Sequence, residues 1–124
     1  MQQTILIVED DQFLRDLLAK KLIDEGFVVE TAIDGQEGLE KIINGKPSLV
    51  LLDIMLPSLD GFEILKQVKH HADAAVTGIP VVMLTNLGQE SDIQKGRELG
   101  AVDYLVKANF TTDEIIQKVR DVLK

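Results

Sequence analysis

Four short apolar runs in this chain each end on a residue that can bind a metal ion or a phosphate group. The runs span residues 5–8, 49–52, 81–84 and 104–106, and they lead to Glu9, Asp10 and Asp11, to Asp53, to Thr85 and to Lys107, in that order. Continuous runs of about four apolar residues, rich in Val, Ile and Leu, are typical of parallel strands buried on both faces. Ligands of open α/β sheets bind beyond the carboxyl ends of such strands. The pattern therefore predicts that acidic, hydroxyl and ammonium groups meet at one edge of a parallel sheet.

Helical patterns alternate with these strand-like runs along the chain. Apolar residues recur at three- and four-residue spacing between the runs, and Asp34 with Glu37 resembles a capping box at one helix start. One more strand, the second along the chain, is predicted over residues 27–31. Residues 72–79 are predicted to form a loop. Five strands and five helices in strict alternation favour parallel pairing with right-handed crossovers. We therefore expect a single α/β domain over residues 1–124, with no output domain in this chain.

The composition limits the functions that this chain can have. Its 21 acidic and 13 basic residues give a formal charge of -8, which disfavours direct binding to nucleic acid, since that affinity comes largely from basic side chains. The chain has no cysteine, so disulfides, thiolate metal sites and thiol catalysis are excluded. Its N-terminus lacks the basic region of a signal peptide, and no apolar stretch approaches the roughly 18 residues that a membrane helix needs. We therefore expect a cytoplasmic protein that binds no membrane.

Glu9, Asp10 and Asp53 would bring three carboxylates to the same edge of the sheet. Two such charges about 5 Å apart repel by roughly 3 kcal/mol at an effective dielectric of 20. A small set of oxygen ligands with room for water suits Mg²⁺ better than Zn²⁺. The Lys107 ammonium suits a phosphate oxygen, and the Thr85 hydroxyl can donate to a second one. These groups together predict a site for in-line phosphoryl transfer, with a carboxylate as the nucleophile.

Each of these residues also has a purely structural interpretation. The acidic triplet that follows the first strand can cap the first helix, Thr85 can be a turn hydroxyl, and Lys107 can be a solvated surface residue. Four such coincidences at one edge are improbable, so we favour the functional interpretation. His70 and His71 are expected at the surface, because they end a predicted helix, where a cation suits the helix dipole.

The same segments resemble the receiver domains of two-component response regulators, and the resemblance spans the whole chain. It rests on residues 5–11, on residues 53–57 with the Asp60 and Gly61 pair, on residues 83–85 and on residues 100–107. The resemblance implies a doubly wound, flavodoxin-like sheet with strand order 2-1-3-4-5 and five helices, which is the order of the chemotaxis receiver.

The resemblance also implies who donates the phosphoryl group and which residues receive it. Asp53 would accept the group from a sensor histidine kinase or a histidine phosphotransfer protein, in a reaction that depends on Mg²⁺. Glu9 and Asp10 would hold the Mg²⁺ ion together with Asp53 and the backbone carbonyl of Met55. The chain would then catalyse only its own phosphorylation and dephosphorylation, and it would not be an enzyme that acts on other molecules.

Thr85, Lys107 and Tyr104 complete the implied switch. Thr85 and Lys107 would contact the phosphoryl oxygens. Phosphorylation would draw Thr85 toward the phosphoryl group and leave space for the Tyr104 ring to turn inward. The surface formed by the predicted helix over residues 89–99, the last strand and the last helix would then bind a downstream protein target.

The chain departs from the family pattern in several places, including the residues after Lys107 and the positions of Met55 and Leu87. The family usually follows the lysine with a cis proline and an aromatic residue, whereas here two residues separate Lys107 from Phe110 and the first of them is Ala108. A cis bond before a residue other than proline costs about 3–4 kcal/mol, so we expect the Lys107–Ala108 peptide to be trans. Met55 and Leu87, two residues after the phosphoacceptor and after the hydroxyl, are apolar. They cannot readily orient a hydrolytic water, which predicts a long-lived phosphorylated form.

Three other functions stay open as alternatives. A magnesium phosphohydrolase of the aspartyl-phosphate type usually has a second Asp two residues after the nucleophile, where this chain has Met55. A nucleotide- or flavin-binding module on the same fold would have a Gly- or Ser/Thr-rich phosphate loop after the first strand, where this chain has three acids. The chain can also be the receiver fragment of a longer regulator with a DNA-binding domain.

Overall fold

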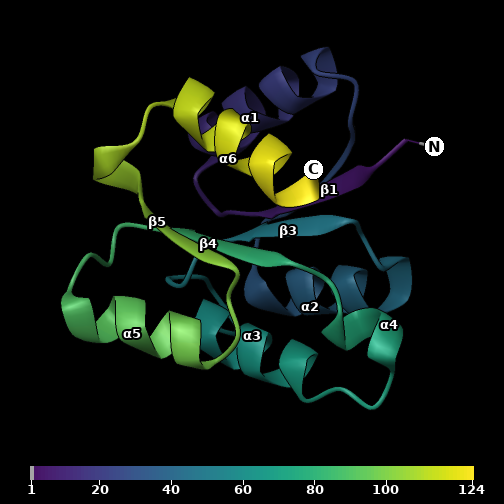
Figure 1. The fold of residues 1–124 in the computed structure, drawn as a ribbon, viewed down its shortest axis with the longest axis vertical. Coiled ribbons are helices and arrows are strands. Elements are labelled where there is room, and N and C mark those ends of the chain that lie inside the picture. The colour runs from purple at the N-terminus through teal and green to yellow at the C-terminus, as the bar shows by residue number, and fades with distance from the viewer. Residues whose placement is uncertain (1) are drawn as a thin grey trace.

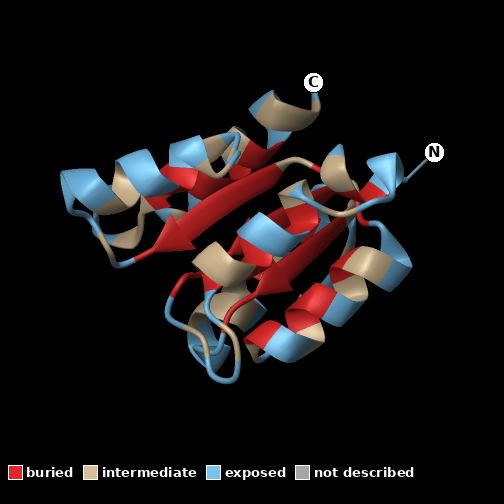
Figure 2. Cartoon of the chain, turned by 90° about the horizontal axis from the view of Figure 1, so that it is seen from below, coloured by how far each residue is buried: buried red, intermediate tan, exposed pale blue. Residues whose placement is uncertain are grey.

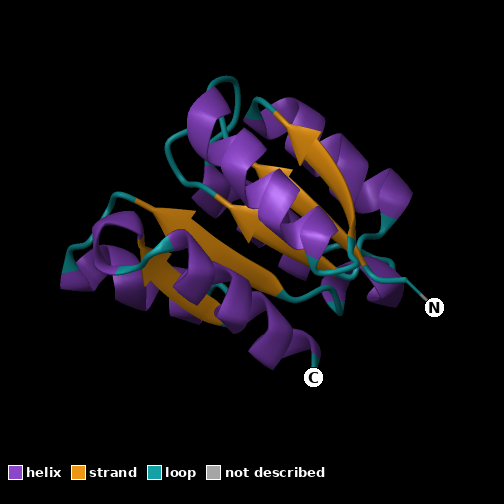
Figure 3. Cartoon of the chain, turned by 90° about the horizontal axis from the view of Figure 1, so that it is seen from above, coloured by secondary structure: helices purple, strands orange, loops and turns teal. Residues whose placement is uncertain are grey.

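Five parallel strands form one sheet in the order β2-β1-β3-β4-β5 (Figure 1), which confirms the predicted strand order. The structure is a computed structural model that describes residues 2–124, so Met1 of the predicted domain lies outside the described residues. The strands are β1 (Thr4–Val8), β2 (Val28–Ala32), β3 (Leu49–Leu52), β4 (Val81–Thr85) and β5 (Asp103–Val106). All of the strand arrows point the same way in Figure 3. Their carboxyl ends therefore meet at one edge of the sheet.

Helices cover both faces of this sheet. They are α1 (Gln12–Asp24), α2 (Gly35–Gly45), α3 (Gly61–Lys69), α4 (Ala74–Thr77), α5 (Glu90–Glu98) and α6 (Thr112–Leu123). Helices α1 and α6 lie on one face, and α2, α3 and α5 lie on the other (Figure 1). The predicted loop over residues 72–79 is wrong in part, because Ala74–Thr77 forms the short helix α4. Asp73 caps that helix by accepting a hydrogen bond of 2.9 Å from the Ala75 N–H.

Strands β1, β3 and β4 are buried on both faces, which explains why their sequences are continuous apolar runs rather than alternating ones, whereas the edge strand β2 is partly exposed and contains Glu30 and Thr31. Ile5 and Ile7 of β1 pack into the core beneath α1 and α6, whereas Leu6 and Val8 pack into the core beneath α2 and α3. Figure 2 shows the strands buried between helices whose outer faces are exposed. The polar side chains at the ends of these strands, Glu9, Asp53 and Thr85, are buried as well, so the first polar groups of these segments lie inside the protein.

Helix capping agrees with the sequence in most places. Asp11 caps α1, since its Oδ1 accepts hydrogen bonds from the first N–H groups of that helix at 3.0 and 3.3 Å. Asp34 caps α2, and Thr111 forms a capping box with Glu114 at the start of α6. Phe13 belongs to the apolar spacing of α1, yet its side chain is 79% exposed. The described residues contain no helix with the length and apolar character that crossing a membrane requires.

Candidate functional site

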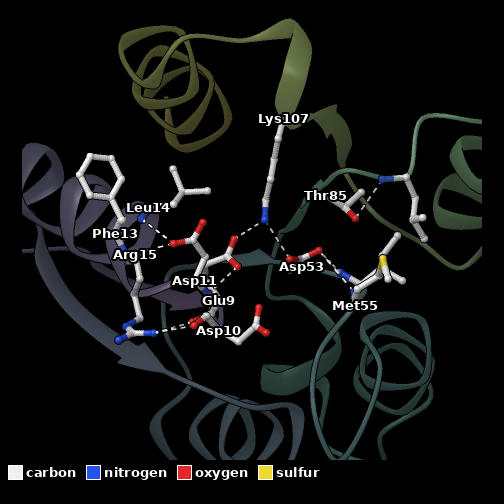
Figure 4. A network of polar contacts seen from close by, with 12 residues as sticks. Glu9, Asp10, Asp11, Phe13, Leu14, Arg15, Asp53, Met55, Thr85 and Lys107 are labelled. Carbon is white, nitrogen blue, oxygen red and sulfur yellow. Dashed lines mark hydrogen bonds and ion pairs between the residues drawn. The ribbon is translucent and has the colours of Figure 1, made fainter.

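The five predicted edge residues lie together at the carboxyl ends of four strands (Figure 4). Glu9 and Asp10 follow β1, Asp53 follows β3, Thr85 ends β4 and Lys107 follows β5. Their strands are neighbours in the sheet, because β1 pairs with β3, β3 with β4 and β4 with β5. The topology therefore brings together groups that are almost 100 residues apart in the sequence.

Asp53 is buried, with 5% of its surface exposed, and both carboxylate oxygens are held by fixed donors. Its Oδ1 accepts hydrogen bonds from the N–H of Ile54 at 2.6 Å and of Met55 at 3.4 Å. Its Oδ2 accepts one from the Lys107 ammonium at 2.9 Å. The backbone behind it is crowded, since a Cβ on Gly61 would lie 2.2 Å from the Asp53 carbonyl oxygen. The carboxylate is therefore fixed in orientation before any ligand arrives.

Lys107 joins the two buried carboxylates of the site. Its Nζ lies 2.6 Å from Glu9 Oε1 and 2.9 Å from Asp53 Oδ2. Both contacts are ion pairs between the ammonium and a buried carboxylate. The lysine leads into a 3₁₀ turn, Lys107–Asn109, and no peptide bond in the described part of the chain is cis. The predicted trans peptide before Ala108 is thus confirmed, and the turn presents the lysine without a cis bond.

Burial and charge act in opposite directions on the pKa values of this pair. Burial raises the pKa of the Glu9 carboxyl above its usual value, with a further contribution from the charge of Asp53, and this outweighs the Lys107 ammonium and the Asp11 N–H. Burial acts to lower the pKa of Lys107, but the carboxylates of Glu9 and Asp53 outweigh it and raise that pKa. Lys107 therefore stays a cation, and burial makes the ionised form of Glu9 less favourable than it is in water.

Glu9, Asp10 and Asp53 each offer a carboxylate oxygen, and these oxygens all lie within 4.8 Å of one another. Asp10 is exposed, and the buried Oε1 of Glu9 has no hydrogen-bond donor. Arg15 donates to the backbone carbonyls of Glu9 and Asp10, at 3.0 and 3.5 Å, and so fixes the turn that carries them. An all-oxygen cluster with one exposed carboxylate, and with a buried oxygen of Glu9 that is paired with the Lys107 ammonium alone, fits a hard divalent cation such as Mg²⁺.

Thr85 and Tyr104 are both tied to the segment that follows β4. The Thr85 hydroxyl is fully buried and accepts a hydrogen bond from the Leu87 N–H at 3.3 Å. The Tyr104 hydroxyl donates to the Leu87 carbonyl at 2.6 Å, and the ring is only 6% exposed. Burial, with the charges of Asp92 and Asp53, raises the pKa of Tyr104 to about 12. The ring is thus already turned inward, which the sequence led us to expect only after phosphorylation.

Three other residues singled out in the sequence form helix caps or local hydrogen bonds. His70 is the exposed C-cap of α3, and the His71 Nδ1 accepts a hydrogen bond from the Asp73 N–H. Asp60 caps α3 by accepting from the Glu63 N–H at 3.0 Å. No pattern in the sequence indicates the role of Arg15, because this residue lies six positions after Glu9 in the middle of a helical pattern.

Comparisons with known proteins agree with this fold and site. The family model described as response regulator receiver domain matches residues 5–120. The alkaline phosphatase synthesis transcriptional regulatory protein PhoP of Bacillus subtilis is 40% identical over 124 residues, which are 100% of this chain and 50% of that protein. The DNA-binding dual master transcriptional regulator RpaA of Synechocystis sp. is 39% identical over 120 residues, which are 97% of this chain and 48% of that protein.

Solved structures show the same architecture over the whole chain. The chemotaxis response regulator CheY4 of Vibrio cholerae has a TM-score of 0.89 at 30% identity, covering 99% of this chain and 100% of that one. A response regulator receiver domain protein of Methanospirillum hungatei also has a TM-score of 0.89 at 30% identity, covering 99% and 94%. The chain belongs to the response regulator receiver domains of two-component systems. It spans about half the length of the curated relatives that it matches.

Proposed function

We propose that this chain is a phosphorylation-controlled switch in which Asp53 accepts a phosphoryl group from the phosphohistidine of a sensor kinase or phosphotransfer protein. The observation that carries the proposal is the position of the Lys107 ammonium, within 3 Å of both Asp53 Oδ2 and Glu9 Oε1. A lysine held between two carboxylates at a sheet edge is placed to meet the negative charge of an incoming phosphoryl group. The transcriptional relatives suggest a regulatory output rather than turnover of a substrate.

The transfer requires one bond to form and one to break. A carboxylate oxygen of Asp53 attacks phosphorus, and the bond between phosphorus and the histidine nitrogen breaks. The electron pair stays on that nitrogen, which then takes up a proton. Lys107 contacts a phosphoryl oxygen, and the Thr85 hydroxyl becomes a donor to a second one after rotating away from the Leu87 N–H. Mg²⁺, held by Glu9, Asp10, Asp53 and the Met55 carbonyl, would neutralise charge on the transferred group.

Partner binding follows from the link between Thr85, Leu87 and Tyr104. A phosphoryl group that captures the Thr85 hydroxyl would release the Leu87 N–H and so alter the backbone to which Tyr104 is bonded. We propose that this changes the surface of α5, β5 and α6, where a downstream protein would bind. In this proposal, phosphorylation shifts the segment that follows β4, which contains Leu87, between two conformations.

Asp10→Asn tests the cation site. In the unaltered chain, Mg²⁺ at ten times its Kd should add about 1.4 kcal/mol to the free energy of unfolding, which is a rise of about 5 °C in Tm. Asp10→Asn removes one of three crowded charges, so it should raise the Tm without metal and abolish the rise with Mg²⁺. Thermal denaturation with and without MgCl₂ measures both effects.

Asp121→Asn on α6 is the charge-matched control, because Asp121 is exposed and accepts a hydrogen bond from Gln117 far from the cluster. It should keep the full response to Mg²⁺. A response to Mg²⁺ in Asp10→Asn as large as in the unaltered chain would place the cation elsewhere.

The lifetime of the phosphorylated form tests the two apolar side chains beside the site. Met55 and Leu87 line one cavity together with Asp10, and neither side chain can hold a water in line behind phosphorus. After the phosphodonor is removed, Met55→Asn/Leu87→Glu should therefore lose its phosphoryl group at least several times faster than the unaltered chain. The apolar exchange Met55→Leu/Leu87→Met serves as the control. Equal decay in all three proteins would show that other groups control access of water.

A further inference from the structure

Ser58 has a backbone conformation that residues other than glycine rarely adopt. Its φ is 68°, and Lys46, a helix C-cap, is the one other non-glycine residue with positive φ in the described chain. Ser58 lies at the tip of the loop between β3 and α3, which begins with Asp53 and ends with Asp60, the residue before α3. Strain held at a defined position in a loop beside a site points to a contact that maintains it.

The Ser58 hydroxyl supplies such a contact at the start of α2. Its Oγ accepts a hydrogen bond from the Gln36 N–H at 3.1 Å and donates to Asp34 Oδ1 at 3.4 Å. The first N–H groups of a helix have no partner within the helix. Asp34 satisfies the Glu37 N–H at 2.9 Å, and Ser58 satisfies the Gln36 N–H. Helix α2 is therefore capped by two residues, one of which comes from the phosphoacceptor loop.

Two further contacts seat the tip of the loop on α2. The Gly35 N–H donates to the Pro57 carbonyl at 3.0 Å. A Cβ on Gly35 would lie 1.7 Å from the Leu59 carbonyl oxygen, so only glycine allows the loop to approach this closely. Ser58 lies in the chain between Pro57 and Leu59, so its hydrogen bonds are in the middle of the contact between the loop and α2.

The base of the loop is fixed independently. The Gly61 N–H donates to the Ile54 carbonyl at 2.9 Å. Between the base at Ile54 and the tip at Pro57 the chain has only two residues, Met55 and Leu56. The position of the Met55 backbone therefore depends on both anchors, and the tip anchor is a set of hydrogen bonds to another helix.

We propose that Ser58 is a positioning residue for the cation site. By capping α2 from outside the helix, it holds the loop tip in place and so restrains the backbone of Met55, whose carbonyl the proposed function assigns to the cation site. This inference rests on the proposed function, because it concerns how well the chain binds Mg²⁺. Ser58 itself contacts neither the cation nor the phosphoryl group.

Three substitutions of Ser58 distinguish the effect of its hydroxyl on Mg²⁺ affinity from the effect of its strained backbone. Ser58→Ala loses both hydrogen bonds and keeps the strain, whereas Ser58→Gly loses the bonds and relieves the strain. Ser58→Asn keeps a side-chain oxygen and tolerates positive φ. Titration calorimetry with MgCl₂ should show a five- to tenfold higher Kd for Ser58→Ala and Ser58→Gly, and a Kd within twofold of the unaltered value for Ser58→Asn. Labelling with acetyl phosphate should need more Mg²⁺ in the first two, with an unchanged rate at saturating Mg²⁺.

Ser48→Ala is the matched control. The Ser48 hydroxyl also accepts a backbone hydrogen bond, from the Thr4 N–H at 3.1 Å, but at the start of β3, opposite the site. This variant should bind Mg²⁺ as the unaltered chain does. An unchanged Kd in Ser58→Ala, or an equal loss of Mg²⁺ affinity in Ser48→Ala, would show that Ser58 does not position the cation site. Either result would leave the proposed function intact. Absence of Mg²⁺ binding by the unaltered chain would overturn the proposed function as well.

Discussion

Asp53→Asn should take up no phosphoryl group from acetyl phosphate and Mg²⁺, whereas the unaltered chain should gain the mass of one. The amide has no anionic oxygen that can attack phosphorus. Its Oδ1 can still accept the hydrogen bond that the Ile54 N–H donates at 2.6 Å, so the fold should persist. Mass spectrometry of the intact protein measures the loss, and circular dichroism checks that the variant is folded.

Asp60→Asn is the control for this experiment. Asp60 belongs to the same loop, but it caps α3, and asparagine is an equally good cap. The control should therefore be labelled in full. Labelling of Asp53→Asn at the level of the unaltered chain would mean that another residue is the acceptor.

Ionisation of Tyr104 should report directly on the position of its ring, because it is the single tyrosine of a chain without tryptophan. The ultraviolet absorbance of tyrosinate should show half-ionisation at a pH of about 12 in the unaltered chain. The inward ring needs Gly96 of α5, since a Cβ there would lie 2.8 Å from the ring Cδ2. Gly96→Ala should therefore turn the ring outward and return its pKa toward the ordinary value of 10.0.

The raised pKa of Tyr104 also predicts how stability depends on pH. An unfolded chain loses the tyrosine proton at a lower pH than the folded chain, so the contribution of this group is complete below about pH 10. That contribution should be lost as the pH rises toward about 12. Denaturant unfolding over this range should show a smaller alkaline loss in Tyr104→Phe, which lacks the ionisable group.

Quenching of tyrosine fluorescence by acrylamide at neutral pH gives a second measure of the ring position. It should rise in Gly96→Ala and stay unchanged in Gln94→Ala, which alters an exposed residue of the same helix. Alanine is favoured over glycine in a helix by about 1 kcal/mol. A Gly96→Ala protein that is more stable, with an unchanged titration and unchanged quenching, would show that α5 shifts instead of the ring.

The strands and the edge residues could be predicted because both depend on local patterns. A strand buried on two faces must be apolar throughout, and the next polar residue then falls at the sheet edge, as Asp53 and Lys107 do. The strand order could be predicted only from the family resemblance, because periodicity alone does not determine the order of strands in a sheet. The trans peptide at Ala108 followed from the cost of a cis bond.

The parts that could not be predicted depend on contacts between distant segments. The cap that Ser58 provides to α2 joins residues 22 positions apart, and nothing in either segment signals it. The inward Tyr104 ring requires the space above Gly96, which in the sequence is only a glycine in a weak helical pattern. The sequence does not indicate helix α4, because its four residues are too few for a periodic signal.

Lys107 makes the acidic edge stable before any metal is bound. Three carboxylates and one ammonium leave two negative charges at the edge, which is the charge that one divalent cation neutralises. Because the Lys107 ammonium is part of the chain, it is a counter-ion that is always present beside Glu9 and Asp53. If the cluster binds Mg²⁺ as proposed, the chain would fold first and take up the ion afterwards, and the fold would not depend on how much magnesium is available.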